Sequence, residues 1–271
     1  MTDQYGLLGY PARHSKSPAM QNAAFAQAGI DANYQIFEVA PDHLTDKFTE
    51  LLHAGVQGFN VTMPYKTAIM PLLDEITPLA QRLAAVNTVV VQDGRTIGDS
   101  TDGPGFWQSL NHTVKTVVII GTGGAARAIM ATAPTGVMLQ VFNRYSAQFI
   151  DKAAIVAELT GTSLHDLATI DDYLPMADLI INATNVGMQD ETAILSTSQL
   201  QTTQPTVVVV DIIYKNEPTP LMMAAQAANR QARDGLDMLI GQGALSFEQW
   251  RQVKPNIKTM QEALFAKAKE E

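Results

Sequence analysis

The chain has 271 residues, 46% of them hydrophobic and 17% charged, a composition typical of a globular protein long enough for two domains. A net charge of −9 without basic clusters argues against binding to nucleic acid or to anionic membranes. The absence of cysteine excludes disulfides, thiolate metal sites and cysteine nucleophiles, and the five histidines are too scattered to form a metal site. Without a signal-peptide pattern or an apolar run of membrane-spanning length, we expect a cytoplasmic protein.

The first hundred residues alternate between strand-like and helix-like segments. Apolar or alternating patterns predict strands at residues 5–8, 34–39, 59–62 and 86–91. Pro18 starts a predicted helix that Gly29 ends, and Asp42 is expected to cap a helix that Gly55 ends. This alternation predicts an α/β layer structure.

A glycine loop follows the β-branched run Val117–Ile120. Its spacing fits G-x-G-x-x-A through Gly121, Gly123 and Ala126. Such a loop binds the pyrophosphate of a dinucleotide at a helix N-terminus, although a tight turn without a ligand has the same appearance. A second strand is predicted at residues 137–142.

Asn143 and Arg144 stand at the end of that second strand, where an acid usually binds the ribose of NAD. Arginine at this point suits a 2′-phosphate, so the sequence favours NADP over NAD. An ordinary surface arginine is the alternative.

The second half of the chain continues the same pattern. Strands are predicted at residues 179–182 and 207–211, followed by helices at 237–250 and from Pro255 to the end. The turn-rich stretch 100–105 is the densest break in the first half. We therefore predict a substrate-binding and catalytic domain at 1–102, a dinucleotide-binding domain at 103–236, and C-terminal helices at 237–271 that return to the first domain.

Three polar segments have the residue types of a catalytic site. Ser15 and Ser17 precede the predicted helix start and could hold a carboxylate, unless Ser17 is simply its N-cap. Lys66 follows a strand end and could exchange a proton if its pKa were lowered, unless it is a solvated lysine. Asp102 lies at the predicted break between domains, where ligands often bind, unless it closes a turn or caps a helix.

Other polar residues are ambiguous when taken alone. Asn87 reads as part of a turn, Tyr214 as an edge of the core and Gln242 as a surface residue of a helix. The order of all these segments, from Gly9 to Trp250, nevertheless resembles the shikimate dehydrogenase family. The resemblance rests on His14-Ser15-x-Ser17-Pro18 with Asn22, Asn60-Val61-Thr62-x-Pro64-x-Lys66, Val86-Asn87-Thr88, Thr101-Asp102-Gly103, the glycine loop with Arg127, Asn143-Arg144, Asn182-Ala183-Thr184 with Gly187-Met188, and Met238-Leu239 with Gln242.

The resemblance implies an α/β protein of two domains: an N-terminal α/β substrate domain completed by the C-terminal helices, and a Rossmann-like NADP-binding domain with a parallel sheet. It implies an oxidoreductase that reversibly reduces 3-dehydroshikimate to shikimate with NADPH, within chorismate and aromatic amino acid biosynthesis. The implied catalytic residues are Lys66 and Asp102. The implied substrate-binding residues are Ser15, Ser17, Thr62, Asn87, Tyr214 and Gln242, and the implied cofactor-binding residues are Gly121, Thr122, Gly123, Gly124, Ala125, Asn143, Arg144, Ile212 and Gly235.

A few positions depart from the family pattern. Tyr145 and Gln148 stand where a hydroxyl residue and a second basic residue are common, which leaves NAD open as a cofactor. Ala84 stands where glycine is common. Quinate remains open as a substrate, and a homodimer is compatible with the sequence. A non-catalytic ligand sensor is disfavoured because Lys66 and Asp102 are both present, and a folate-type dehydrogenase is disfavoured by the serine pair.

Overall fold

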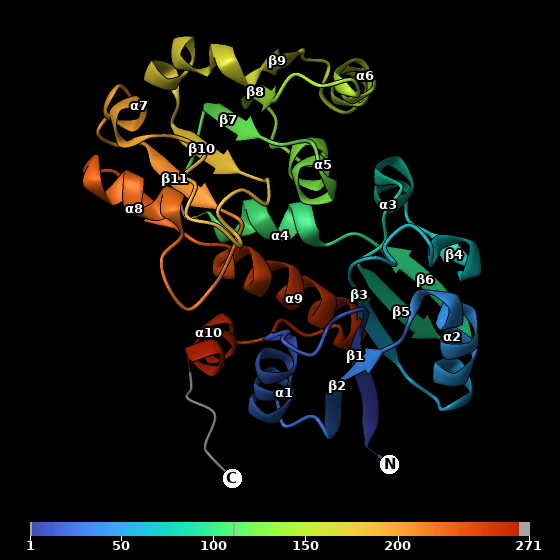
Figure 1. The fold of residues 1–271 in the computed structure, drawn as a ribbon. Helices are drawn as coiled ribbons and strands as arrows, with labels where there is room; N and C mark the ends of the chain where they lie inside the picture. The colour runs from blue at the N-terminus through green and yellow to red at the C-terminus, as the bar shows by residue number, and fades with distance from the viewer. Residues whose placement is uncertain (1, 111, 266–271) are drawn as a thin grey trace. The chain divides into compact units, whose positions relative to one another are not determined.

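The computed structural model describes residues 2–110 and 112–265 and divides into two compact units. The first unit comprises Met1–Gly105 with Leu239–Glu271, and the second comprises Phe106–Met238. Each unit is built around its own six-stranded sheet (Figure 1). Within the described residues, no helix is long and apolar enough to cross a membrane.

The sheet of the first unit is mixed. Its strands are β1 (Asp3–Gly9), β2 (Ala32–Glu38), β3 (Gly58–Val61), β4 (Glu75–Ile76), β5 (Thr88–Gln92) and β6 (Arg95–Asp99), in the order β2-β1-β3-β5-β6-β4. β1 pairs in parallel with β2 and β3, whereas β5 runs antiparallel to β3 and β6. The short strands β4 and β6 were not predicted, and the strand predicted from residue 86 begins at Thr88.

Helices surround this sheet. They are α1 (Ser17–Gln27), α2 (Leu44–His53), α3 (Pro78–Leu83) and α10 (Ile257–Phe265), while α4 (Asp102–Ser109) and α9 (Leu236–Arg251) each contain a boundary between the units. The prediction that Asp42 caps a helix is wrong, because Pro41–His43 forms a separate 3-10 turn and no side chain caps α2. The predicted terminal helix starts at Ile257 rather than Pro255, and its part beyond Phe265 lies outside the described residues.

The C-terminal helices pack on the N-terminal sheet through aromatic rings. Phe25 stacks on Tyr5 and contacts Phe247, with ring centroids 5.0 and 4.9 Å apart. The indole of Trp250 lies 5.1 Å from the Tyr5 ring and donates a hydrogen bond of 2.9 Å to the carbonyl of Val89. Because the other three rings are almost fully buried and Trp250 is half-buried, α9 is held firmly against the sheet that positions the polar residues described below.

The second unit has an entirely parallel sheet. Its strands are β7 (Thr116–Ile120), β8 (Met138–Asn143), β9 (Leu164–Asp166), β10 (Leu179–Asn182), β11 (Val208–Asp211) and β12 (Gln231–Arg233), in the order β12-β11-β10-β7-β8-β9. Its helices are α5 (Gly124–Ala131), α6 (Phe149–Thr160), α7 (Thr197–Gln201) and α8 (Pro220–Ala227). This is the doubly wound 3-2-1-4-5-6 order, which confirms the predicted dinucleotide-binding type of fold.

The β-branched runs of this sheet are buried on both faces. Val117 and Ile119 of β7 join a core that includes residues of α5 and α6, whereas Val118 and Ile120 join a core that includes residues of α7 and α8. Figure 1 shows α5 and α8 on opposite sides of the strands. The alternation of side chains along each strand therefore explains why the runs are apolar throughout rather than at every second residue.

Candidate active site

Lys66 and Asp102 form an ion pair in the first unit. Lys66 follows β3, and its backbone carbonyl accepts a hydrogen bond of 2.8 Å from the N–H of Val86, which fixes the turn. Its Nζ donates to Oδ2 of Asp102, the first residue of α4, at 2.6 Å. The side chains are 30% and 13% exposed, so Lys66 is not a freely solvated surface lysine.

Asn87 connects this pair to Gln242. Its Nδ2 donates to Oδ1 of Asp102 at 2.8 Å and to Oε1 of Gln242 at 3.3 Å, and its Oδ1 accepts from the N–H of Thr101 at 2.7 Å. The structure thus brings together four residues that the sequence placed in the site. Both oxygens of Asp102 have donors, whereas the Lys66 ammonium has three N–H groups and uses one of them on Asp102.

Ser15 and Ser17 lie at the start of α1 but do not cap it. Lys16 precedes the helix, and no side chain caps its N-terminus. Ser15 Oγ accepts from the N–H of Ser17 and donates to Ser17 Oγ, at 3.2 Å in both cases. The alternative in which Ser17 is an ordinary N-cap is therefore wrong, and the predicted binding of a carboxylate by the two adjacent hydroxyls stays a prediction.

Thr62 lies directly after β3, beside the segment that leads to the serines. Its N–H donates to the carbonyl of Leu8 at 2.9 Å. A Cβ on Gly9 would lie 2.3 Å from Thr62 Cγ2, so only glycine permits this approach. The half-buried Thr62 is therefore held against Gly9, at the start of the segment that leads to Ser15.

A buried polar network, which the sequence analysis did not predict, connects strands of the first unit to α9. Tyr34 donates from its hydroxyl to Oδ1 of Asn60 at 2.9 Å, and Asn60 donates to Oγ of Ser246 at 2.8 Å. Ser246 is also 2.8 Å from the hydroxyl of Thr88, which neighbours Asn87. Burial raises the pKa of Tyr34 well above its usual value, whereas a hydrogen bond with Ser17 opposes this rise. The sequence signal for this network was the presence of two polar residues, Asn60 and Thr88, within buried strands.

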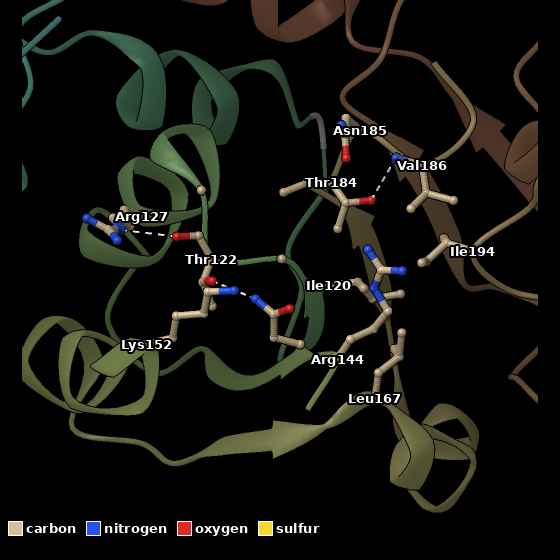
Figure 2. Close-up of a pocket in the computed structure, with 14 residues that line it drawn as sticks. Ile120, Thr122, Arg127, Arg144, Lys152, Leu167, Thr184, Asn185, Val186 and Ile194 are labelled. Carbon is tan, nitrogen blue, oxygen red and sulfur yellow. Dashed lines mark hydrogen bonds between the residues drawn. The ribbon is translucent and has the colours of Figure 1, made fainter. Parts of the chain in front are cut away.

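The second unit contains a cavity of about 440 Å³ at the carboxyl ends of its strands (Figure 2). It lies where β7 and β10 are neighbours, the point at which the strand order reverses and at which doubly wound sheets bind ligands. The residues that line it are Ile120, Gly121, Thr122, Gly123, Arg127, Asn143, Arg144, Lys152, Leu167, Ala183, Thr184, Asn185, Val186 and Ile194. Gly124 and Ala125 begin α5 and are not among these residues.

The glycine loop of this cavity fits a dinucleotide. Gly121 has φ +116°, and a Cβ there would lie 2.7 Å from the carbonyl oxygen of Ala183. At Gly123, which precedes α5, a Cβ would have no neighbour within 4 Å, so the backbone is open to a ligand. Asn143 Nδ2 donates to Thr122 Oγ1 at 2.6 Å and ties the end of β8 to the loop. The free N–H groups of a helix start suit the pyrophosphate.

Ile212, Tyr214 and Gly235 belong to the second unit and do not line this cavity. A Cβ on Gly235 would lie 2.0 Å from the carbonyl oxygen of Ile212, so glycine is required where the two segments meet. The structure therefore brings Ile212 and Gly235 together, as expected if both contact one ligand group. Tyr214 is 36% exposed, and its predicted contact with substrate stays a prediction.

The buried carboxylate of Asp211, whose role the sequence analysis did not predict, connects the segments that follow β10 and β11. Asp211 Oδ1 accepts from Asn182 Nδ2 at 3.0 Å, and its Oδ2 accepts from Thr219 Oγ1 at 2.7 Å. Asn182 Oδ1 in turn accepts from the N–H and hydroxyl of Thr184, which lines the cavity. Burial raises the pKa of Asp211, although these hydrogen bonds limit the rise.

Comparison with known proteins identifies the family. The family model for the shikimate dehydrogenase substrate binding domain matches residues 7–89, and that for the shikimate 5′-dehydrogenase C-terminal domain matches residues 235–265. A shikimate dehydrogenase (NADP(+)) of Shouchella clausii is 38% identical over 96% of this chain and 97% of its own length. The chain belongs to the shikimate dehydrogenase family.

Solved structures agree with that membership. Shikimate 5-dehydrogenase from Thermus thermophilus, in complex with NADP(H) and shikimate, superposes with a TM-score of 0.85 at 32% identity, covering 97% of this chain and 98% of that one. A quinate dehydrogenase from Corynebacterium glutamicum in complex with NAD has a TM-score of 0.86 at 28% identity, covering 98% and 99%. The shikimate dehydrogenase scaffold therefore extends over nearly the whole chain.

Proposed function

We propose that this protein is an NADP-dependent shikimate dehydrogenase, which reversibly reduces 3-dehydroshikimate to shikimate in chorismate and aromatic amino acid biosynthesis. The observation that supports this proposal most directly is the ion pair of Lys66 with Asp102, whose other oxygen is held by Asn87. It occurs in a chain that belongs to the shikimate dehydrogenase family. A lysine fixed beside a carboxylate is suited to moving one proton to and from an oxygen atom.

The reaction interconverts a ketone and an alcohol. NADPH, when bound, supplies the hydride for the reduction. Lys66, as an ammonium, donates a hydrogen bond to the ketone oxygen and transfers its proton as negative charge develops there. In the oxidation, neutral Lys66 takes the proton of the hydroxyl. Asp102 orients Lys66 throughout, and acid–base help of this kind is worth about 10²–10⁴-fold in rate.

The same proposal assigns the binding residues. Ser15 and Ser17 donate their hydroxyls to the substrate carboxylate, with Thr62 and Tyr214 assisting. Asn87 and Gln242 hydrogen-bond the ring hydroxyls, and both already contact one another beside Asp102. The first unit would thus be the substrate-binding and catalytic domain, including its C-terminal helices.

The second unit would hold the cofactor. The loop Gly121–Ala125 binds the pyrophosphate, Asn143 and Arg144 contact the phosphorylated ribose of adenosine, and Ile212 with Gly235 lies beside the nicotinamide. The reported fit of the loop, with glycine required at Gly121 and open space at Gly123, supports this assignment. The expected cytoplasmic location and the possible homodimer stay predictions.

One experiment tests the proposal against its alternatives. The purified protein is incubated with shikimate or quinate and with NADP⁺ or NAD⁺, and the absorbance of the reduced nicotinamide is followed. We expect the highest kcat/KM with shikimate and NADP⁺. A higher kcat/KM with quinate or with NAD⁺ would contradict that part of the proposal, and binding of shikimate without turnover would indicate a ligand sensor.

A further inference from the structure

The two amide side chains assigned to the ring hydroxyls of the substrate come from different elements of the first unit. Gln242 lies in α9, and Asn87 directly precedes β5. The contact between their amide groups is 3.3 Å, longer than an ordinary hydrogen bond, so it cannot by itself fix their spacing. We propose that Ser246 is the positioning residue that sets this spacing and thereby the affinity for shikimate. The inference rests on the proposed function.

Ser246 is a fully buried residue of α9, one helical turn beyond Gln242. Its hydroxyl donates to the backbone carbonyl of Gln242 at 3.0 Å and accepts from Nδ2 of Asn60, in β3, at 2.8 Å. It also lies 2.8 Å from the hydroxyl of Thr88, the first residue of β5. With Thr88 as donor, these three bonds use the one proton and both lone pairs of the serine. Ser246 therefore joins the turn of α9 that carries Gln242 to two strands of the sheet.

The partners of Ser246 hold Asn87 in their turn. Nδ2 of Asn60 also donates to the backbone carbonyl of Asn87 at 3.1 Å, and Thr88 is the next residue in the chain. The Asn60 amide cannot turn over freely, because its Oδ1 accepts from the hydroxyl of Tyr34 at 2.9 Å. All of these side chains are buried, so water does not compete for their hydrogen bonds. The position of Ser246 is therefore transmitted to Asn87 through fixed contacts.

The packing of α9 around Gln242 makes such a polar connection necessary. A Cβ on Gly105 would lie 2.3 Å from the backbone nitrogen of Gln242, and a Cβ on Gly241 would lie 2.2 Å from the carbonyl oxygen of Gly105. Where two glycines meet backbone to backbone, no side chain interlocks with the neighbouring helix. The aromatic contacts of α9 lie on the C-terminal side of Ser246. The hydrogen bonds of Ser246 therefore tie this turn of α9 to the strands beside Asn87.

The test separates substrate binding from turnover. Steady-state kinetics and calorimetry with shikimate are carried out on the wild type, Ser246→Ala, Gln242→Ala and the double variant. We expect Ser246→Ala to raise the KM and the Kd for shikimate about fivefold, the effect of losing one ordinary hydrogen bond. The kcat and the KM for NADP⁺ should stay within about twofold of wild type, because in the described chain Ser246 has no hydrogen bond to Lys66 or Asp102.

The double variant distinguishes positioning from general support of the fold. If Ser246 acts by placing Gln242 relative to Asn87, removing the Gln242 amide makes that spacing irrelevant. Ser246→Ala should then raise the KM for shikimate by less than about twofold in the Gln242→Ala background. Damage to the fold alone would multiply the two losses instead.

Ser109→Ala is the matched control, because the Ser109 hydroxyl donates within its own helix, to the carbonyl of Phe106 at 2.7 Å. It should leave the KM for shikimate unchanged. An unchanged KM in Ser246→Ala, or an equal rise in both backgrounds, overturns the inference while the proposed function stands. A wild type that neither binds nor oxidises shikimate overturns the proposed function and the inference with it.

Discussion

The Lys66 ammonium lies 2.6 Å from one oxygen of Asp102, and the other oxygen of Asp102 is held by the Asn87 amide at 2.8 Å. Asp102 therefore cannot rotate away from Lys66 without losing two hydrogen bonds. The pairing fixes the direction in which Lys66 presents its remaining N–H groups. It also makes Asp102 a natural orienting group for a proton transfer by Lys66.

Replacing Lys66 tests whether it transfers the proton. We expect Lys66→Ala to lower kcat by about 10²–10⁴-fold while the Kd for shikimate stays within about tenfold of wild type, because the proton transfer matters in the transition state rather than in the ground state. Steady-state kinetics and calorimetry measure the two quantities separately. A Lys66→Ala enzyme with nearly normal kcat would refute the assignment.

Asp102→Asn tests whether the two residues act together. The amide keeps the shape of the side chain but loses the charge that orients Lys66, so kcat should fall here too. If Asp102 works mainly through Lys66, the double variant should be little worse than Lys66→Ala alone. Strictly additive losses of activation free energy would show that the residues act independently.

Replacing Ser15 tests whether the serines at the start of α1 bind the substrate carboxylate. Ser15→Ala removes a hydroxyl assigned to the substrate carboxylate, and a hydrogen bond to a charged group is worth about 1.5–3 kcal/mol, so the KM for shikimate should rise roughly tenfold to a hundredfold. The KM for NADP⁺ should not change. Ser15 Oγ does accept from the N–H of Ser17 at the start of α1, but the bond is long at 3.2 Å, so the melting temperature should fall only slightly. A lower melting temperature with unaltered kinetics would indicate a purely structural role.

The sequence predicted those parts of the site that lie next to strongly patterned elements. The glycine loop follows an apolar, β-branched run that is typical of a buried strand, so its position and its ligand class could be predicted together. Asn143 and Arg144 were found in the same way, from the end of the next strand. Lys66 and Asp102 depended on the family resemblance, since nothing in their local sequence says that residues 36 positions apart form an ion pair.

The supporting contacts could not be predicted, for a physical reason. Asn60 pairs with Ser246 across 186 residues, and Asn182 pairs with Asp211 between neighbouring strands. Such contacts depend on which elements pack together, which a one-dimensional pattern of polarity does not encode. The failed cap at Asp42 has a local cause: Pro41 begins a short 3-10 turn before α2, which moves the true helix start beyond Asp42.

Ala84 offers a stability test away from the site. It ends α3 with φ +50°, in the left-handed region, and the N–H of Ala85 bonds back to the carbonyl of Ala80 at 3.1 Å, as in a glycine-type helix end. Left-handed backbone costs a residue with a Cβ about 1–2 kcal/mol, while glycine costs about 0.4–1 kcal/mol in the entropy of the unfolded chain. We therefore expect Ala84→Gly to raise the free energy of unfolding by about 0.5–1 kcal/mol.

Ala85→Gly is the matched control for that test, because residue 85 is not among the non-glycine residues with positive φ in the described chain. It should lower the free energy of unfolding, since it adds unfolded-state entropy without relieving strain. Urea denaturation of both variants measures the difference. Equal effects of the two substitutions would show that the backbone at Ala84 carries no strain.

Asp211 should make the stability of the protein depend on pH in a defined direction. Burial raises the pKa of its carboxyl above the ordinary 3.8, so the folded state binds this proton more tightly than the unfolded state does. The resulting stabilisation is complete below the unfolded pKa and is lost as the pH rises through the higher folded pKa. Asp211→Asn cannot ionise and should escape that loss.

The quantity to measure is the difference in the free energy of unfolding between Asp211→Asn and wild type, by urea denaturation between about pH 4 and pH 8. The other acids are common to both proteins and largely cancel in this difference. The amide nitrogen must donate to Thr219 Oγ1, which already caps α8 by accepting from Met222, so the variant need not be the more stable protein in absolute terms. We expect the difference to shift in favour of the variant as the pH rises and then to level off. A difference that is constant with pH, or one that shifts in favour of the wild type, would show that Asp211 ionises at least as readily in the folded protein as in the unfolded chain.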